Sequence, residues 1–86
     1  MYSVEFLPTA KDDLTALDKV IAQRILKKIR WLAENFEQIT PQPLSGNWHG
    51  FFKLRVGSYR VIYTLTPTST TILIHFIKHR REVYKL

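Results

Sequence analysis

The hydrophobic pattern of this chain changes its period from helical to alternating at residues 40–43, and no other feature of the sequence limits the possible folds as strongly. Before this point, hydrophobic residues recur every three or four positions, as they do along one face of a helix: they are Ile21, Ile25, Ile29, Leu32 and Phe36. Two prolines, Pro41 and Pro43, then exclude a longer helix because neither has a backbone N–H. From residue 51 the pattern alternates with a period of two, which indicates strands. The chain is therefore expected to place helices before a sheet, in the α+β class.

The first half of the chain is predicted to form a strand followed by two helices. Residues 2–7 are short, partly alternating and rich in residues that favour strands, and Pro8 ends them. Thr9 and Asp12 have the spacing of a capping box, which predicts the start of a short helix there. Asp18 is expected to cap a second, longer helix that carries the hydrophobic stripe. The two helices would form an αα-hairpin with one hydrophobic face.

Three strands are predicted in the second half, over residues 51–56, 59–65 and 71–78. Gly57 and Ser58 would form a tight hairpin turn between the first two strands. The expected order is β-α-α-β-β-β, with the helical hairpin packed on one face of a small sheet that is mainly antiparallel. The whole chain, 86 residues long, is expected to be a single domain.

One face of the predicted sheet carries cations. Lys53, Arg55 and Arg60 alternate with hydrophobic neighbours, so they are expected to point away from the side that the helices cover. The charge follows the same division, because residues 1–43 hold six basic and six acidic side chains, whereas residues 44–86 hold seven basic and one acidic. The whole formal charge of +6 therefore lies in the second half. This indicates a polyanionic partner, which could be a nucleic acid, an acidic protein or an anionic membrane.

Several classes of protein are excluded by what the sequence lacks. It has no cysteine, so it can hold no disulfide, zinc knuckle or thiol nucleophile. It has no glycine-rich phosphate loop, and its three histidines lack the carboxylate or thiol neighbours of a metal site, so we expect no metal and no cofactor. The chain opens on a strand without a leader segment, and its longest hydrophobic run is too short to span a bilayer. A soluble, cytoplasmic protein without a membrane partner is expected.

The side chains left for chemistry are cationic and phenolic: they are Lys53, Arg55, Arg60, Lys78, His79, Arg80, Arg81 and Tyr84. Such a set could cleave RNA without a metal ion. An arginine can stabilise the extra charge of the phosphorane, and a lysine, histidine or tyrosine can transfer a proton. The alternative is a solvated or nucleic-acid-binding face without chemistry, and composition alone favours that alternative.

Three segments of the sequence, taken in order, resemble the RelE/ParE toxin superfamily, and its RelE branch best. They are Leu44 with Gly46, the run FKLRVGSYRVIY over residues 52–63, and HRREVY over residues 79–84. The resemblance spans nearly the whole chain and implies a RelE-like fold. It also implies a toxin of a type II toxin–antitoxin module that enters the ribosomal A site and cleaves mRNA there without a metal. The implied partners are the ribosome, mRNA and a RelB-like antitoxin that wraps the toxin, so an oligomer with the antitoxin is expected.

The resemblance also assigns roles to particular residues. Lys53 matches a lysine proposed as general base or charge stabiliser, and Arg55 matches a basic residue beside it. Arg60 matches the arginine that contacts the scissile phosphate. Tyr84 matches the C-terminal tyrosine that stacks on or orients the substrate base.

The last basic residues and the general base are less simply matched. A further family arginine falls on Arg80 when counted from the last strand and on Lys78 when counted back from the C-terminal tyrosine; we take Arg80 as catalytic. We assign Lys78 and Arg81, like Arg55, to nucleic-acid binding. Where RelE has another lysine of the catalytic face, this chain has Phe51, and His79 could compensate for it. The identity of the general base stays open.

Two other functions are compatible with the same sequence. A ParE-like inhibitor of DNA gyrase would use the same scaffold, but such chains tend to lack the basic residues and tyrosine that end this one. A plain RNA-binding module without a target enzyme is the third reading. The first hypothesis remains a ribosome-dependent mRNA endoribonuclease.

Overall fold

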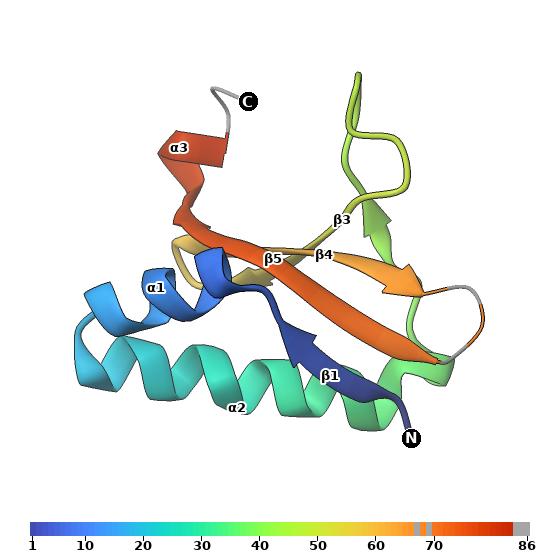
Figure 1. Ribbon diagram of the computed structural model, residues 1–86, viewed down its shortest axis with the longest axis horizontal. Helices are drawn as coiled ribbons and strands as arrows, with labels where there is room; N and C mark the ends of the chain where they lie inside the picture. Colours follow the sequence, from blue (N-terminus) through green and yellow to red (C-terminus); the bar gives the residue numbers. More distant parts are fainter. Residues whose placement is uncertain (67, 69, 84–86) are drawn as a thin grey trace.

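The computed structural model describes residues 1–66, 68 and 70–83 and shows a five-stranded sheet with a helical hairpin on one side of it (Figure 1). The elements in chain order are β1 (Ser3–Phe6), α1 (Pro8–Ala16), α2 (Lys19–Asn35), the 3₁₀-helix η1 (Phe36–Gln38), β2 (Gln42–Pro43), β3 (Phe52–Val56), β4 (Tyr59–Thr66), β5 (Thr71–His79) and α3 (Arg80–Val83). The α+β class and the packing of the helical hairpin on one face of the sheet are confirmed. Within the described part of the chain, no helix has the length and apolar character needed to cross a membrane.

The strands follow the order β1-β5-β4-β3-β2, so the first strand of the chain pairs with the last. β1 is parallel to β5, and the remaining neighbours are antiparallel. The predicted hairpin turn is confirmed, because Val56 pairs with Tyr59 across Gly57, whose φ of +57° is readily adopted by glycine. The two-residue strand β2 was not expected, since Pro43 lacks an amide proton. It is tolerated here because β2 lies at the edge of the sheet.

The two helices begin for different reasons. The predicted cap of α2 is confirmed, because the Asp18 side chain accepts a hydrogen bond from the Val20 N–H at 3.2 Å. The predicted capping box of α1 is wrong. Its N-cap is Leu7, without a side-chain hydrogen bond, and Pro8 occupies the first turn, where its missing N–H costs nothing. The hydroxyl of Thr9 instead donates to the carbonyl of His75 on β5.

The core lies between α2 and the sheet. α2 buries its predicted stripe, with Ile25 and Leu32 at 0% exposed and Ile29 at 2%. These side chains belong to one cluster with buried residues of the strands, namely Leu54, Val56, Val61, Tyr63, Ile72, Ile74 and Ile77. This burial is the main favourable contribution to the stability of the fold.

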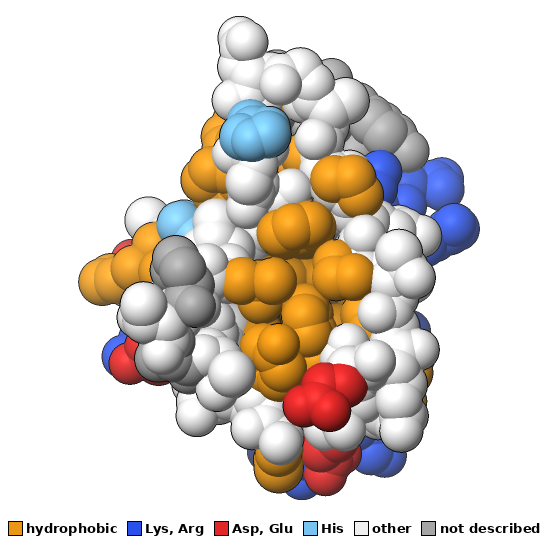
Figure 2. Space-filling view, turned by 90° about the vertical axis from the view of Figure 1, so that its right-hand side faces the viewer, with side chains coloured by type: hydrophobic (Ala, Val, Ile, Leu, Met, Phe, Trp, Pro, Cys, Tyr) orange, Lys and Arg blue, Asp and Glu red, His pale blue; other side chains and the backbone are white. Residues whose placement is uncertain are grey.

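The aromatic part of the core extends to one side of the molecule. The Phe36 ring lies 4.6 Å from that of Tyr2 and 6.3 Å from that of Tyr63, which stacks on Phe52 at 5.7 Å. Burial raises the pKa of Tyr63 to about 12, so its phenol stays neutral at physiological pH. Figure 2 looks onto the side of the molecule where the N-terminus, η1 and β2 lie, and shows hydrophobic side chains gathered at its centre.

Candidate functional site

The sheet face opposite the helices, called the outer face below, brings four cations from three strands together. Strand register places Arg55, Arg60 and Lys78 side by side across β3, β4 and β5. The neighbouring row contains Lys53, Ile62 and Phe76. Arg55 is exposed and Lys53 is partly buried. The strand register therefore places Lys53, Arg55 and Arg60 on one face of the sheet, as the alternation in the sequence predicted.

Arg60 differs from the expected exposed cation, because only 7% of its surface is accessible. Its Nη1 atom donates to the carbonyl of Gly57 at 3.0 Å and to that of Tyr59 at 2.9 Å. Gly57 lies in the β3–β4 turn and Tyr59 is the first residue of β4, so the turn and the start of β4 hold the guanidinium in one orientation. A buried guanidinium fixed in this way is a preorganised positive charge, which is what a developing phosphate charge requires.

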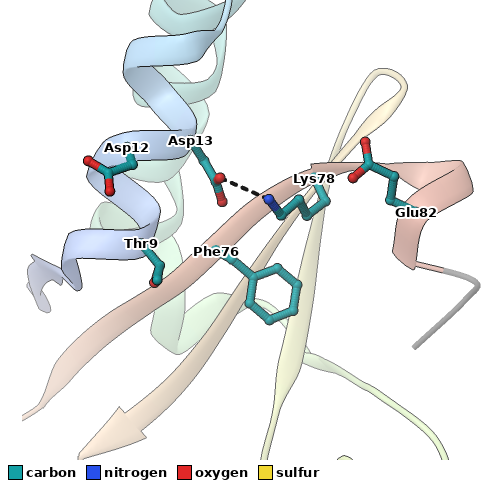
Figure 3. Close-up of a pocket in the computed structure, with 6 residues that line it drawn as sticks. All are labelled: Thr9, Asp12, Asp13, Phe76, Lys78 and Glu82. Carbon is teal, nitrogen blue, oxygen red and sulfur yellow. Dashed lines mark hydrogen bonds and ion pairs between the residues drawn. The ribbon is translucent and has the colours of Figure 1, made fainter.

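Lys78 is the second cation with a fixed partner. Its Nζ atom lies 3.0 Å from Oδ1 of Asp13 on α1 (Figure 3). The other carboxylate oxygen accepts a hydrogen bond from the Ile77 N–H at 2.9 Å. The Lys78 side chain remains 41% exposed, whereas Asp13 is 15% exposed. The ammonium is therefore oriented by a carboxylate and still reaches solvent.

Sequence reasoning missed Asp13. It treated the aspartates only as helix residues, because nothing in the sequence places Asp13 beside β5. With Lys78 and Phe76, Asp13 lines a pocket of about 450 Å³, whose other lining residues are Thr9, Asp12 and Glu82. The sequence held one signal for it: Thr9 and Asp13 are four residues apart, so they lie on the same side of a helix and could contact the same strand.

The predicted residues of the C-terminal segment do not all reach the outer face. His79 lies opposite Tyr59, its ring 5.4 Å away, on the side of the sheet that faces the helices. Its Nδ1 atom accepts a hydrogen bond from the Arg81 N–H at 3.3 Å. Arg80 and Arg81 are exposed on α3, which rises beside the outer face (Figure 1). Tyr84 lies outside the residues that the structure describes.

One histidine does lie over the outer face. The Nε2 atom of His75 is 2.8 Å from the hydroxyl of Thr64, and its ring lies 4.9 Å from that of Phe51. Burial lowers the pKa of His75. Among the described residues, no three histidine, aspartate or glutamate side chains lie close enough together to hold a metal ion.

A second basic surface lies beside the outer face, between α2 and β3. It is a groove of about 460 Å³ whose cations are Arg24, Lys27, Lys28 and Arg55. Trp31 also lines it, 40% exposed, with the Lys28 ammonium 3.9 Å from the centre of the indole. Arg55 borders both surfaces, so positive charge continues from the outer face to α2.

Comparison with known proteins finds similarity to toxins of type II toxin–antitoxin systems. The family model described as the ParE toxin of type II toxin–antitoxin system, parDE, matches residues 4–84. Toxin RelG of Mycobacterium tuberculosis is 29% identical over 84 residues, which are 98% of this chain and 97% of RelG. A chain in the crystal structure of the toxin–antitoxin complex RelBE2 from the same organism is 30% identical, with a TM-score of 0.81 over 92% of this chain and 98% of that one.

The isolated RelE toxin of Escherichia coli shares the fold. It is 20% identical, with a TM-score of 0.76 over 99% of this chain and 93% of RelE. The family model covers nearly the whole chain, and the sequence resemblance and the structural likeness agree with it. The chain belongs to the RelE/ParE superfamily of toxins from type II toxin–antitoxin systems.

Proposed function

We propose that the protein is a ribosome-dependent mRNA endoribonuclease that inhibits translation by cleaving mRNA in the A site without a metal ion. One observation carries the proposal: the outer face combines a buried, oriented guanidinium, Arg60, with the side chains of Lys53, Arg55 and Lys78. The resemblance to RelE toxins supports the same activity.

The proposed chemistry divides among these cations. The 2′-hydroxyl attacks the adjacent phosphate and loses its proton, while the 5′-oxygen of the next nucleotide leaves and gains one. Arg60 stabilises the charge of the phosphorane with the guanidinium N–H groups that the turn leaves unused. Lys53 acts as base or charge stabiliser, and Lys78 and Arg55 hold the flanking phosphates. Arg80, Arg81 and Tyr84 would act from the C-terminal segment, whereas His79 lies on the opposite side of the sheet.

The proposal includes partners and a location. A chain similar to this one was crystallised in a toxin–antitoxin complex, which supports a RelB-like antitoxin as partner and an oligomer of the two proteins. A toxin that acts on translating ribosomes works in the cytoplasm.

In vitro translation followed by primer extension on the mRNA tests the proposal. We expect cuts at fixed codon positions that appear only when ribosomes are present. Lys53→Ala should abolish these cuts, whereas Lys11→Ala, which removes the same charge from an exposed position of α1, should leave them unchanged. Intact mRNA at toxin concentrations that stop translation would contradict the proposal.

Inhibition of DNA gyrase is the second candidate, because the matching family model is described as a ParE toxin. A supercoiling assay with purified gyrase separates the two functions. Blocked supercoiling together with intact mRNA would favour the gyrase inhibitor, and unaffected supercoiling together with codon-phased cuts would favour the endoribonuclease.

A further inference from the structure

Four aromatic side chains form a cluster on the outer face, at the end away from Arg55. Trp48 and Phe51 come from the segment between β2 and β3, and His75 and Phe76 come from β5. The Trp48 ring lies 5.1 Å from that of Phe51 and 6.1 Å from that of Phe76, and the Phe51 ring lies 4.9 Å from that of His75. Residues 48, 51, 75 and 76 are called the aromatic cluster below.

The aromatic cluster is partly exposed, and its rings meet edge to face. The ring planes meet at 62° to 87°, so none of these pairs is stacked face to face. Trp48, Phe51 and Phe76 are all partly exposed. A group of partly exposed aromatic rings gathered on one face is a candidate binding site.

The backbone around Trp48 is held by hydrogen bonds within its own segment. The Leu44 N–H donates to the carbonyl of Phe51 at 2.9 Å, and the Phe51 N–H donates to the carbonyl of Trp48 at 3.1 Å. In Figure 1 this segment rises on the side of the sheet away from α1 and α2, as α3 does. A ring held by its own turn loses little conformational entropy when a ligand stacks on it.

The aromatic cluster adjoins the cations. Phe76 shares its row across the sheet with Lys53, and the next row contains Lys78, Arg60 and Arg55. Because side chains on one face of a strand are two residues apart, the rows are separated by roughly 7 Å. The outer face thus has an aromatic part beside a cationic part.

Single-stranded RNA has the complementary arrangement, with planar bases on one side of an anionic backbone. Proteins that bind single strands combine a cationic surface for the phosphates with aromatic rings for the bases. We infer that the aromatic cluster is a stacking site for an unpaired nucleobase, with Trp48 as the stacking ring, while the phosphates lie on the cationic part. This inference rests on the proposed function, since it takes the substrate to be single-stranded RNA.

Tryptophan fluorescence tests the stacking directly. In the Trp31→Phe variant, Trp48 is the one tryptophan left in the sequence. A hexaribonucleotide with methylated 2′-hydroxyls, which cannot be cleaved by the proposed chemistry, is the probe. We expect the probe to quench Trp48 at saturation, and the same oligomer without its bases to leave the fluorescence unchanged.

Affinity for the same probe gives an independent measure. Trp48→Ala should bind the probe about 5- to 150-fold more weakly, the range expected for one base–aromatic stack. Trp48→Phe, which keeps a ring, should recover part of the loss. Val20→Ala, which shortens an exposed hydrophobic side chain of α2, is the control and should bind as the original protein does. Circular dichroism and thermal unfolding show whether each variant is folded.

The outcomes distinguish this inference from the proposed function. Unquenched Trp48 at saturation, equal binding by Trp48→Ala, or no binding of the probe at all would each overturn the stacking site. A protein ligand that quenches Trp48 while the probe does not would assign the cluster to a protein partner and overturn it too. Quenching by the probe, combined with intact mRNA in the translation assay, would retain the stacking site and reject the endoribonuclease.

Discussion

Arg60 shows how one residue serves the fold and the site together. A guanidinium at 7% exposure must satisfy its N–H groups within the protein, and the carbonyls of Gly57 and Tyr59 accept two of these hydrogen bonds. The alternation of the sequence gives the face on which Arg60 lies. It could not give the burial, because the acceptors exist only once the β3–β4 turn has formed.

Replacing Arg60 should therefore affect activity and stability at once. Arg60→Ala is expected to slow cleavage about a hundredfold or more, the usual cost of removing a preorganised transition-state contact. It should also lower the free energy of unfolding by about 1–3 kcal/mol, because two partly buried hydrogen bonds from a charged donor are lost. Arg60→Lys keeps the positive charge but lacks the planar guanidinium. Relative to Arg60→Ala, it should restore more of the free energy of unfolding than of the cleavage rate. Primer extension and urea unfolding measure the two effects, and a folded Arg60→Ala toxin with unchanged cleavage would remove Arg60 from the site.

His75 should make stability depend on pH. Burial lowers the pKa of His75 in the folded protein below the ordinary 6.5 that it has when unfolded. Between these two values the unfolded chain binds the proton and the folded chain does not, so stability falls as the pH drops below about 6.5. Urea unfolding at a series of pH values should show this fall. His75→Gln, which does not titrate, should show a smaller one, and equal slopes for the two proteins would contradict the assignment.

At the scale of elements, the edge of β5 is completed by α1. β1 pairs with β5 only over Thr71–Ile74, and beyond this point side chains of α1 take its place. Thr9 donates to the carbonyl of His75, and Asp13 accepts from the N–H of Ile77. The helix thus satisfies backbone groups that an unprotected edge strand would leave open.

Replacing Asp13 separates its hydrogen bond from its charge. Asp13→Ala leaves the Ile77 N–H without its acceptor and should lower the free energy of unfolding by about 1–3 kcal/mol. Asp13→Asn keeps an acceptor oxygen, so it should be more stable than the alanine variant while still losing the ion pair with Lys78. Urea unfolding and hydrogen exchange of the Ile77 amide measure the difference. Equal stability of both variants would mean that the contact with β5 contributes little.

Elements with a strong local signal were predictable, and contacts between distant segments were not. The stripe from Ile21 to Phe36 identified α2, and alternation identified β3 and β4 to within a residue. The parallel pairing of β1 with β5 and the contact of Asp13 with Lys78 join residues more than sixty positions apart. No local pattern encodes such contacts. The strand β2 was missed because proline is tolerated only in an edge strand, and the sequence does not show which strand lies at the edge of the sheet.

At the scale of the whole molecule, the proposed chemistry assigns to the cations the charge that a metal ion supplies in metal-dependent nucleases. Arg60 and Lys78 are each held by a protein partner, so their charges are in place before RNA binds. We expect the purified toxin to contain no stoichiometric zinc or manganese and to cleave mRNA at full rate after treatment with a chelator and return to the ribosome buffer. Elemental analysis by mass spectrometry checks the first expectation. One equivalent of either metal, lost together with activity, would overturn the proposed chemistry.

The distribution of charge over the molecule should make RNA binding strongly dependent on salt. Three accessible cations of the outer face, Lys53, Arg55 and Lys78, can each neutralise one phosphate, and each released counterion steepens the response. With about three phosphate contacts on a single strand, the logarithm of the association constant should fall with a slope of about −2 against the logarithm of salt concentration. Raising salt from 50 to 200 mM should then weaken binding roughly 15- to 20-fold.

Fluorescence anisotropy with an uncleavable RNA measures this slope. Arg55→Ala should reduce its magnitude by about 0.7, whereas Lys11→Ala on α1 should leave it unchanged. A flat response, or equal slopes for the two variants, would move the RNA contact away from the outer face.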